Sequence, residues 1–167
     1  MRRYNVTTFG CQMNAHDSER IKGLLESSGL GEAATLDEAD VIVFNTCTIR
    51  EKADSRLEAH LHQARRLKEA DPSRRIVVGG CWSESLKDEI FATYPWVDFA
   101  FGPGAISRLG PFVERDEGAG RGHFGTFEEF AGDLPTHRDR AFQGWLQISM
   151  GCNSVCSYCI VPSVRGR

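Results

Sequence analysis

Short apolar runs alternate along the chain with longer segments in which apolar residues recur every three or four positions. The runs predict β-strands, which need only about four to eight residues, at residues 3–9, 41–44, 76–78 and 97–101. The run Val41-Ile42-Val43-Phe44 contains no polar residue. Such a run is typical of a strand that is buried on both faces of a parallel sheet.

Helices are predicted between these strands from the spacing of the apolar side chains. Asn14 or Asp17 is a suitable N-cap for the first helix, and Gly29 is suited to end it. Later helices are expected at about 51–70, 85–93 and 106–113. Strand and helix alternate throughout, so we expect an α/β fold with a flavodoxin- or Rossmann-like parallel sheet and flanking helices.

Length and composition are those of a globular protein with a proper core. The chain has 167 residues, of which 41% are hydrophobic, and its net charge of −3 gives no overall basic field for nucleic acid. No signal peptide or long apolar run is present, so we expect a cytoplasmic protein that does not enter a membrane. Without a secretory signal, six cysteines favour metal binding or catalysis over a disulfide scaffold.

Three of the cysteines stand just after the first three predicted strands. These residues, Cys11, Cys47 and Cys81, are separated by 36 and 34 residues, about one strand–helix unit each. Because the carboxyl ends of parallel strands share one edge of the sheet, the three thiols should converge there. Each also precedes a helix, whose N-terminal dipole favours a thiolate. A single buried cysteine is often only a small hydrophobe, but the common position of all three indicates a shared site.

The other three cysteines are spaced C-x3-C-x2-C, at Cys152, Cys156 and Cys159, with Tyr158 before the last. A short loop of this kind can present three thiolates to one metal centre and leave one iron of a 4Fe-4S cluster open to another ligand. A disulfide with a spare thiol and part of a zinc knuckle are the alternatives. Arg165, close behind the loop, is interpreted as a partner for phosphate or carboxylate, or as a solvated side chain.

The composition changes between these two groups of cysteines. Residues 115–141 are rich in glycine and acidic residues and have little apolar periodicity, which predicts a linker. We therefore divide the chain into a first domain at 1–114, the linker, and the beginning of a second domain at 142–167. Residues 142–150 are expected to form a strand that delivers the Cys152 loop at its carboxyl end, as the first strand of a βα barrel does.

The motifs at residues 10–14, 17–19, 45–53, 79–81 and 151–159 resemble those of the methylthiotransferases. These are radical S-adenosylmethionine (SAM) enzymes that attach a methylthio group to tRNA or to a ribosomal protein. The resemblance spans nearly the whole chain. Within the family, residues 12–14 and 49–53 resemble the branch that acts on N6-isopentenyl-adenosine next to the tRNA anticodon.

The resemblance implies two 4Fe-4S clusters, each held by one set of three cysteines. SAM would bind the open iron of the cluster on the Cys152 loop, with its adenine near Tyr158, and the other cluster would carry the sulfur. It also implies a monomer with a tRNA substrate, an electron donor such as flavodoxin, and a methylthio group added at C2 of the adenine. Radical chemistry of this kind belongs to the cofactor, which the protein orients.

Other interpretations remain open at this point. The chain is compatible with a non-catalytic iron–sulfur or zinc-binding fragment, or with a methylthiotransferase for another tRNA base or a ribosomal protein. A whole enzyme of the family would add the rest of the barrel and an RNA-binding domain. We therefore expect the 167-residue chain by itself to be inactive.

Overall fold

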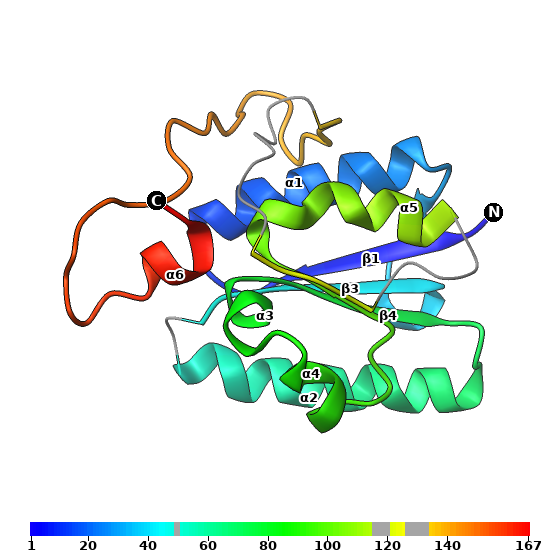
Figure 1. The fold of residues 1–167 in the computed structure, drawn as a ribbon. Coiled ribbons are helices and arrows are strands. Elements are labelled where there is room, and N and C mark those ends of the chain that lie inside the picture. The colour runs from blue at the N-terminus through cyan, green and yellow to red at the C-terminus, as the bar shows by residue number, and fades with distance from the viewer. Residues whose placement is uncertain (49–50, 115–120, 126–133) are drawn as a thin grey trace.

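A six-stranded parallel sheet forms the centre of the fold (Figure 1). The computed structural model describes residues 1–48, 51–114, 121–125 and 134–167, and within residues 51–55 only the backbone. The strands are β1 (Arg3–Thr8), β2 (Gly31–Glu32), β3 (Val41–Thr46), β4 (Arg75–Gly80), β5 (Phe99–Phe101) and β6 (Gly122–His123). Their order in the sheet is β2-β1-β3-β4-β5-β6, and the first five follow the flavodoxin-like order 2-1-3-4-5.

Helices cover both faces of the sheet, as Figure 1 shows. One face carries α1 (Gln12–Ser27) and α5 (Leu109–Glu114), and the other carries α2 (Glu51–Ala70), α3 (Cys81–Leu86) and α4 (Glu89–Thr93). Two short 3-10 helices, η1 (Leu36–Glu38) and η2 (Pro103–Arg108), lie in the connections. The last helix, α6 (Val161–Arg165), packs against α3 and η2.

Alternate residues of the central strands supply the two halves of the core. Val41 and Val43 of β3 pack with Leu25 of α1, whereas Ile42 and Phe44 belong to the cluster of apolar side chains on the α2 face. All four β3 side chains are fully buried. The α/β fold with a parallel sheet buried on both faces, predicted from the apolar runs, is therefore confirmed.

Several element boundaries differ from the predicted ones. Helix α1 begins at Gln12 with Cys11 as its N-cap, earlier than the expected caps at Asn14 or Asp17. The helix expected at 85–93 is divided into α3 and α4 at Lys87, which has a φ of 51° and a ψ of −129°. Side chains strongly disfavour this backbone conformation, so the helix cannot continue through it.

Replacing Lys87 by glycine should stabilise the fold by about 1 kcal/mol. Relief of the strain at positive φ contributes about 1–3 kcal/mol, and the greater freedom of glycine in the unfolded chain removes roughly 0.5–1 kcal/mol of it. Urea denaturation of Lys87→Gly measures the change. Lys87→Ala is the matched control, because it shortens the side chain without relieving the backbone. An equal gain from both variants would contradict the backbone explanation.

The strand expected at residues 142–150 is not formed. This segment pairs with no other strand in the described ranges, and its large apolar side chains, Phe142, Leu146 and Ile148, are 85–91% exposed. An extended segment becomes a strand only when a neighbour takes up its backbone hydrogen bonds. The sequence pattern was suited to a strand, but none of the described strands lies beside it.

Two parts of the expected linker are ordered against the first domain. Gly122–His123 forms β6 beside β5, and residues near His137 run along α1, where the His137 N–H donates to the Glu19 carbonyl at 2.9 Å. The Arg138 guanidinium also contacts the Glu19 carboxylate at 2.8 Å. The remaining domain boundaries proposed from composition, at residues 114, 141 and 142, stay predictions.

Among the described helices, none has both the length and the apolar character that crossing a bilayer requires.

Candidate metal centre

The first three cysteines lie at the carboxyl ends of three neighbouring strands. Cys47 and Cys81 directly follow β3 and β4, and Cys11 stands three residues beyond the end of β1. Because β1, β3 and β4 are adjacent and parallel, no strand separates the three positions. The strand order reverses between β1 and β3, and crevices at such switch points are where ligands bind in open α/β sheets.

The turns that carry these cysteines are in contact. A methyl group added at Gly10 would stand 2.8 Å from Cys47 Cβ, so the turn before Cys11 lies directly against Cys47. At Gly80, an added methyl would stand 2.3 Å from the Thr46 carbonyl oxygen. Glycine at both positions is what allows the three turns to approach this closely.

A buried amide network connects the same turns. The Asn14 side chain donates to the Thr46 carbonyl at 3.0 Å, and the Asn45 side chain donates to the Asn14 carbonyl at 2.8 Å and to Ser18 Oγ at 2.9 Å. Both asparagine side chains are at most 1% exposed. The Thr46 hydroxyl adds a bond to the Gly79 carbonyl at 2.7 Å. These bonds fix the Cys11, Cys47 and Cys81 turns relative to one another.

Cys81 has a charged neighbour that the strand pattern did not reveal. Arg165 Nε donates to Cys81 Sγ at 3.3 Å, and Arg165 Nη2 donates to Asp17 Oδ2 at 2.6 Å. Burial raises the pKa of the Cys81 thiol, while the Arg165 guanidinium lowers it. Burial is the larger of these two influences, so the pKa of the Cys81 thiol lies above its ordinary value.

Arg165 itself is 7% exposed, so the interpretation as a solvated side chain is wrong. Its carboxylate partner in the described residues is Asp17, and a contact with substrate phosphate or carboxylate stays a prediction. Its sequence position, at the end of the chain and close to the Cys152 loop, gave no indication that it packs against Asp17 and Cys81. Asn14 and Asn45 were likewise missed as organising residues. Their burial within a polar network follows from the tertiary fold and not from any local pattern.

The Cys152 loop closes on itself beside α6. The Cys152 N–H donates to the Gly166 carbonyl at 3.2 Å, and a methyl group at Gly151 would stand 1.8 Å from that oxygen. The Cys159 N–H donates to the Cys156 carbonyl at 3.1 Å. The Ser154 N–H donates to Cys152 Sγ at 3.4 Å and lowers the pKa of that thiol. The loop therefore brings its three cysteines into one short turn and exposes Cys156 to solvent.

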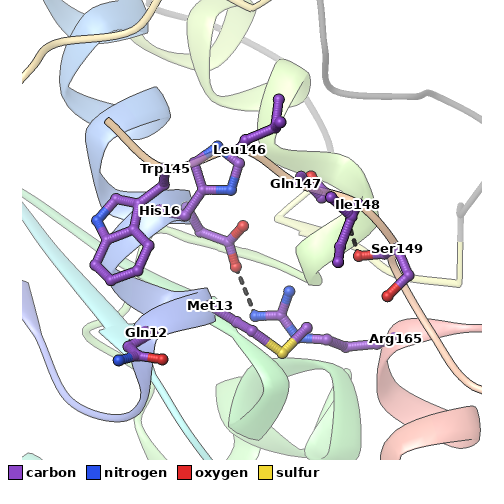
Figure 2. A pocket seen from close by; sticks show the side chains of 10 residues that line it. Gln12, Met13, His16, Trp145, Leu146, Gln147, Ile148, Ser149 and Arg165 are labelled. Carbon is purple, nitrogen blue, oxygen red and sulfur yellow. Dashed lines mark hydrogen bonds and ion pairs between the residues drawn. The ribbon is translucent and has the colours of Figure 1, made fainter. Parts of the chain in front are cut away.

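A pocket lies between α1, the segment 145–149 and Arg165 (Figure 2). Met13, His16 and Asp17 line it from α1, and Trp145 and Ile148 line it from the other side. Arg165, labelled in Figure 2, contacts the Asp17 carboxylate at 2.6 Å within this lining. The cysteines of the first group do not line this pocket, so the shared site expected for their three thiols stays a prediction.

The thiols of both cysteine groups are free to act as metal ligands. All six cysteines carry free thiols, so neither set of three is tied up in a disulfide. In the described ranges, no three His, Cys, Asp or Glu side chains are arranged to hold one metal ion. A cluster fills the space between its thiolates, so three thiols on neighbouring turns can bind it without touching each other.

The fold and the motifs place the chain in a known family. Residues 3–102 match the family described as "Uncharacterized protein family UPF0004". This match covers the parallel sheet through β5 together with Cys11, Cys47 and Cys81. The chain therefore belongs to this family.

Curated relatives extend the similarity to the whole chain. The chain is 47% identical over 169 aligned residues to the tRNA-2-methylthio-N(6)-dimethylallyladenosine synthase of Corynebacterium urealyticum, with 99% of this chain and 31% of that protein covered. The proteins of the same name from Mycolicibacterium smegmatis and Thermobifida fusca are each 45% identical, over 100% and 99% of this chain and 33% and 34% of their own lengths. The chain spans about a third of these relatives, and their names confirm the resemblance to methylthiotransferases.

Proposed function

We propose that the chain is the N-terminal part of a tRNA methylthiotransferase that attaches a methylthio group to C2 of N6-isopentenyl-adenosine next to the anticodon. The observation that carries this proposal is the 45–47% identity, over 99–100% of the chain, to synthases named for this product. The two separate sets of three free thiols support it, because the chemistry needs two metal centres with an open position each.

The residues divide into two groups in this proposal. Cys11, Cys47 and Cys81 hold one 4Fe-4S cluster at the carboxyl edge of the sheet, where the Asn14–Asn45 network keeps their turns in place. Cys152, Cys156 and Cys159 hold the other cluster. When bound, the clusters together with SAM supply the radical chemistry and the sulfur that an unactivated adenine C–H bond requires.

The roles of the remaining residues and partners follow from the same assignment. Tyr158, whose side chain is 90% exposed, is free to lie against the SAM adenine. We infer a tRNA substrate, an electron donor such as flavodoxin and a monomeric state. We also infer a cytoplasmic location, because tRNA is modified in the cytoplasm.

Reconstitution with iron and sulfide under anaerobic conditions tests the metal assignment. We expect about eight iron atoms per chain, four for each cluster, with a broad brown absorption. Iron quantitation, acid-labile sulfide analysis and the absorption spectrum are the measurements. A chain that takes up zinc to a colourless product and holds no iron would contradict the proposal and favour a zinc-binding protein.

A further inference from the structure

Arg165 joins the two groups of cysteines. It stands six residues after Cys159 in the sequence, and its guanidinium contacts Cys81 Sγ at 3.3 Å and Asp17 Oδ2 at 2.6 Å. The side chains of Arg165 and Asp17 are each 7% exposed. A residue of α6, which directly follows the second cysteine loop, therefore reaches a sulfur of the first group.

Around this contact the Asp17 carboxylate faces two guanidinium groups, those of Arg165 and Arg20. A guanidinium remains charged in proteins, and a buried charge needs a partner. Asp17 supplies one negative charge, but it also attracts the positive charge of Arg20 on the same helix. Arg20 donates a hydrogen bond to Gln147, which is uncharged, at 2.7 Å. His16 and Arg138 are further charged or titratable groups close to Asp17 and Arg20, and Arg138 is paired with Glu19 at 2.8 Å. A negatively charged Cys81 sulfur would offset the remaining positive charge.

We propose that Arg165, held by Asp17, is a positioning residue for the cluster on Cys11, Cys47 and Cys81. It docks the Cys152 loop against α1 and α3, and it raises the reduction potential of the cluster by donating a charged hydrogen bond to the Cys81 sulfur. Hydrogen bonds and positive charge near cluster sulfurs stabilise the reduced, more negative form. This inference rests on the proposed function, because it requires a cluster at these three cysteines.

The effect of Arg165 on the reduction potential, called the tuning below, is tested in a chain that carries only the cluster on Cys11, Cys47 and Cys81. In the 167-residue chain with Cys152, Cys156 and Cys159 replaced by alanine, Arg165→Met should leave about four iron atoms per chain and shift the midpoint potential to more negative values. Arg165→Lys should restore most of the potential, because it keeps the charge. Arg140→Met is the matched control, since Arg140 is exposed and its guanidinium donates to Gln143, three residues along the chain.

The docking is tested without any metal. Trypsin cleaves after arginine, and burial protects Arg165 in the native fold. Asp17→Asn keeps the shape of the side chain but removes the charge, so cleavage after Arg165 should become at least roughly tenfold faster, because loss of one partner weakens a buried ion pair. Cleavage after the exposed Arg140 should be unchanged and serves as the internal reference.

The outcomes separate this inference from the proposed function. Absence of iron from the otherwise unaltered chain would overturn the proposed function and the tuning with it, while the trypsin experiment would still decide the docking. Normal iron content with a midpoint potential that Arg165→Met does not change would overturn the tuning alone. Equal cleavage after Arg165 in the Asp17→Asn variant and the parent chain would overturn the docking.

Discussion

Replacing Cys152, Cys156 and Cys159 together by alanine should remove half of the reconstituted iron and leave the spectrum of the other cluster intact. The expected iron content falls from about eight to about four atoms per chain. The physical reason is that this loop is held by bonds within itself, such as the one from the Cys159 N–H to the Cys156 carbonyl. The turns of the first group are instead fixed by the separate Asn14–Asn45 network.

The reciprocal variant, with Cys11, Cys47 and Cys81 replaced by alanine, is the matched control. It should also retain about half of the iron, but with the spectrum of the Cys152 loop cluster. Iron quantitation and electron paramagnetic resonance of the reduced proteins distinguish the two. Loss of all iron from either triple variant would show that the six cysteines form one site, contrary to the proposal.

Replacing Asn45 by alanine should lower the free energy of unfolding by roughly 2–3 kcal/mol, since a buried hydrogen-bonding group left without a partner costs about 1–3 kcal/mol. Asn45 is 1% exposed and donates to the Asn14 carbonyl and to Ser18 Oγ. The side-chain amide oxygen of Asn45, Oδ1, accepts a hydrogen bond from the Asn14 side chain at 3.3 Å. The variant should also bind less iron at the first group of cysteines, because their turns lose the contact that fixes them.

Asn5→Ala provides the matched comparison for Asn45→Ala. Asn5 lies on the adjacent strand β1 and is paired in register with Ile42, but its side chain is only half-buried and contacts Thr7 within its own strand. We expect a change within about 0.5 kcal/mol, as for other substitutions outside the core. Urea denaturation of both variants measures the difference. Equal stability of Asn45→Ala and the unaltered chain would show that the amide network does not organise this edge.

The sheet was predictable because its signal is local. The run at Val41–Phe44 has no polar residue, and a strand buried on both faces requires this. The alternation of strands and helices then restricts the fold to a parallel sheet, in which the loops that follow the strands lie at the carboxyl edge. The division of the expected helix at Lys87 was not predictable, because one residue with positive φ leaves no signature in the apolar spacing.

The strand predicted at 142–150 did not form, because local composition alone does not decide strand pairing. Its apolar and aromatic residues, such as Trp145 and Ile148, have the composition of a strand. Strand formation, however, depends on hydrogen bonds to a neighbour that the sequence of the segment itself cannot supply. Among the described residues the segment instead lines a pocket beside α1.

The sequence by itself determined the parallel sheet and the position of a cysteine after each of the first three strands that the apolar runs predict. Periodicity and the geometry of parallel connections are sufficient for this, because both depend on residues that are close in the chain. Tertiary structure alone decided that β1, β3 and β4 are adjacent, that Asn14 and Asn45 connect their ends, and that Arg165 reaches Cys81 and Asp17. Arg165 and Asp17 are 148 residues apart in the sequence, and the chain must fold before burial can pair their charges.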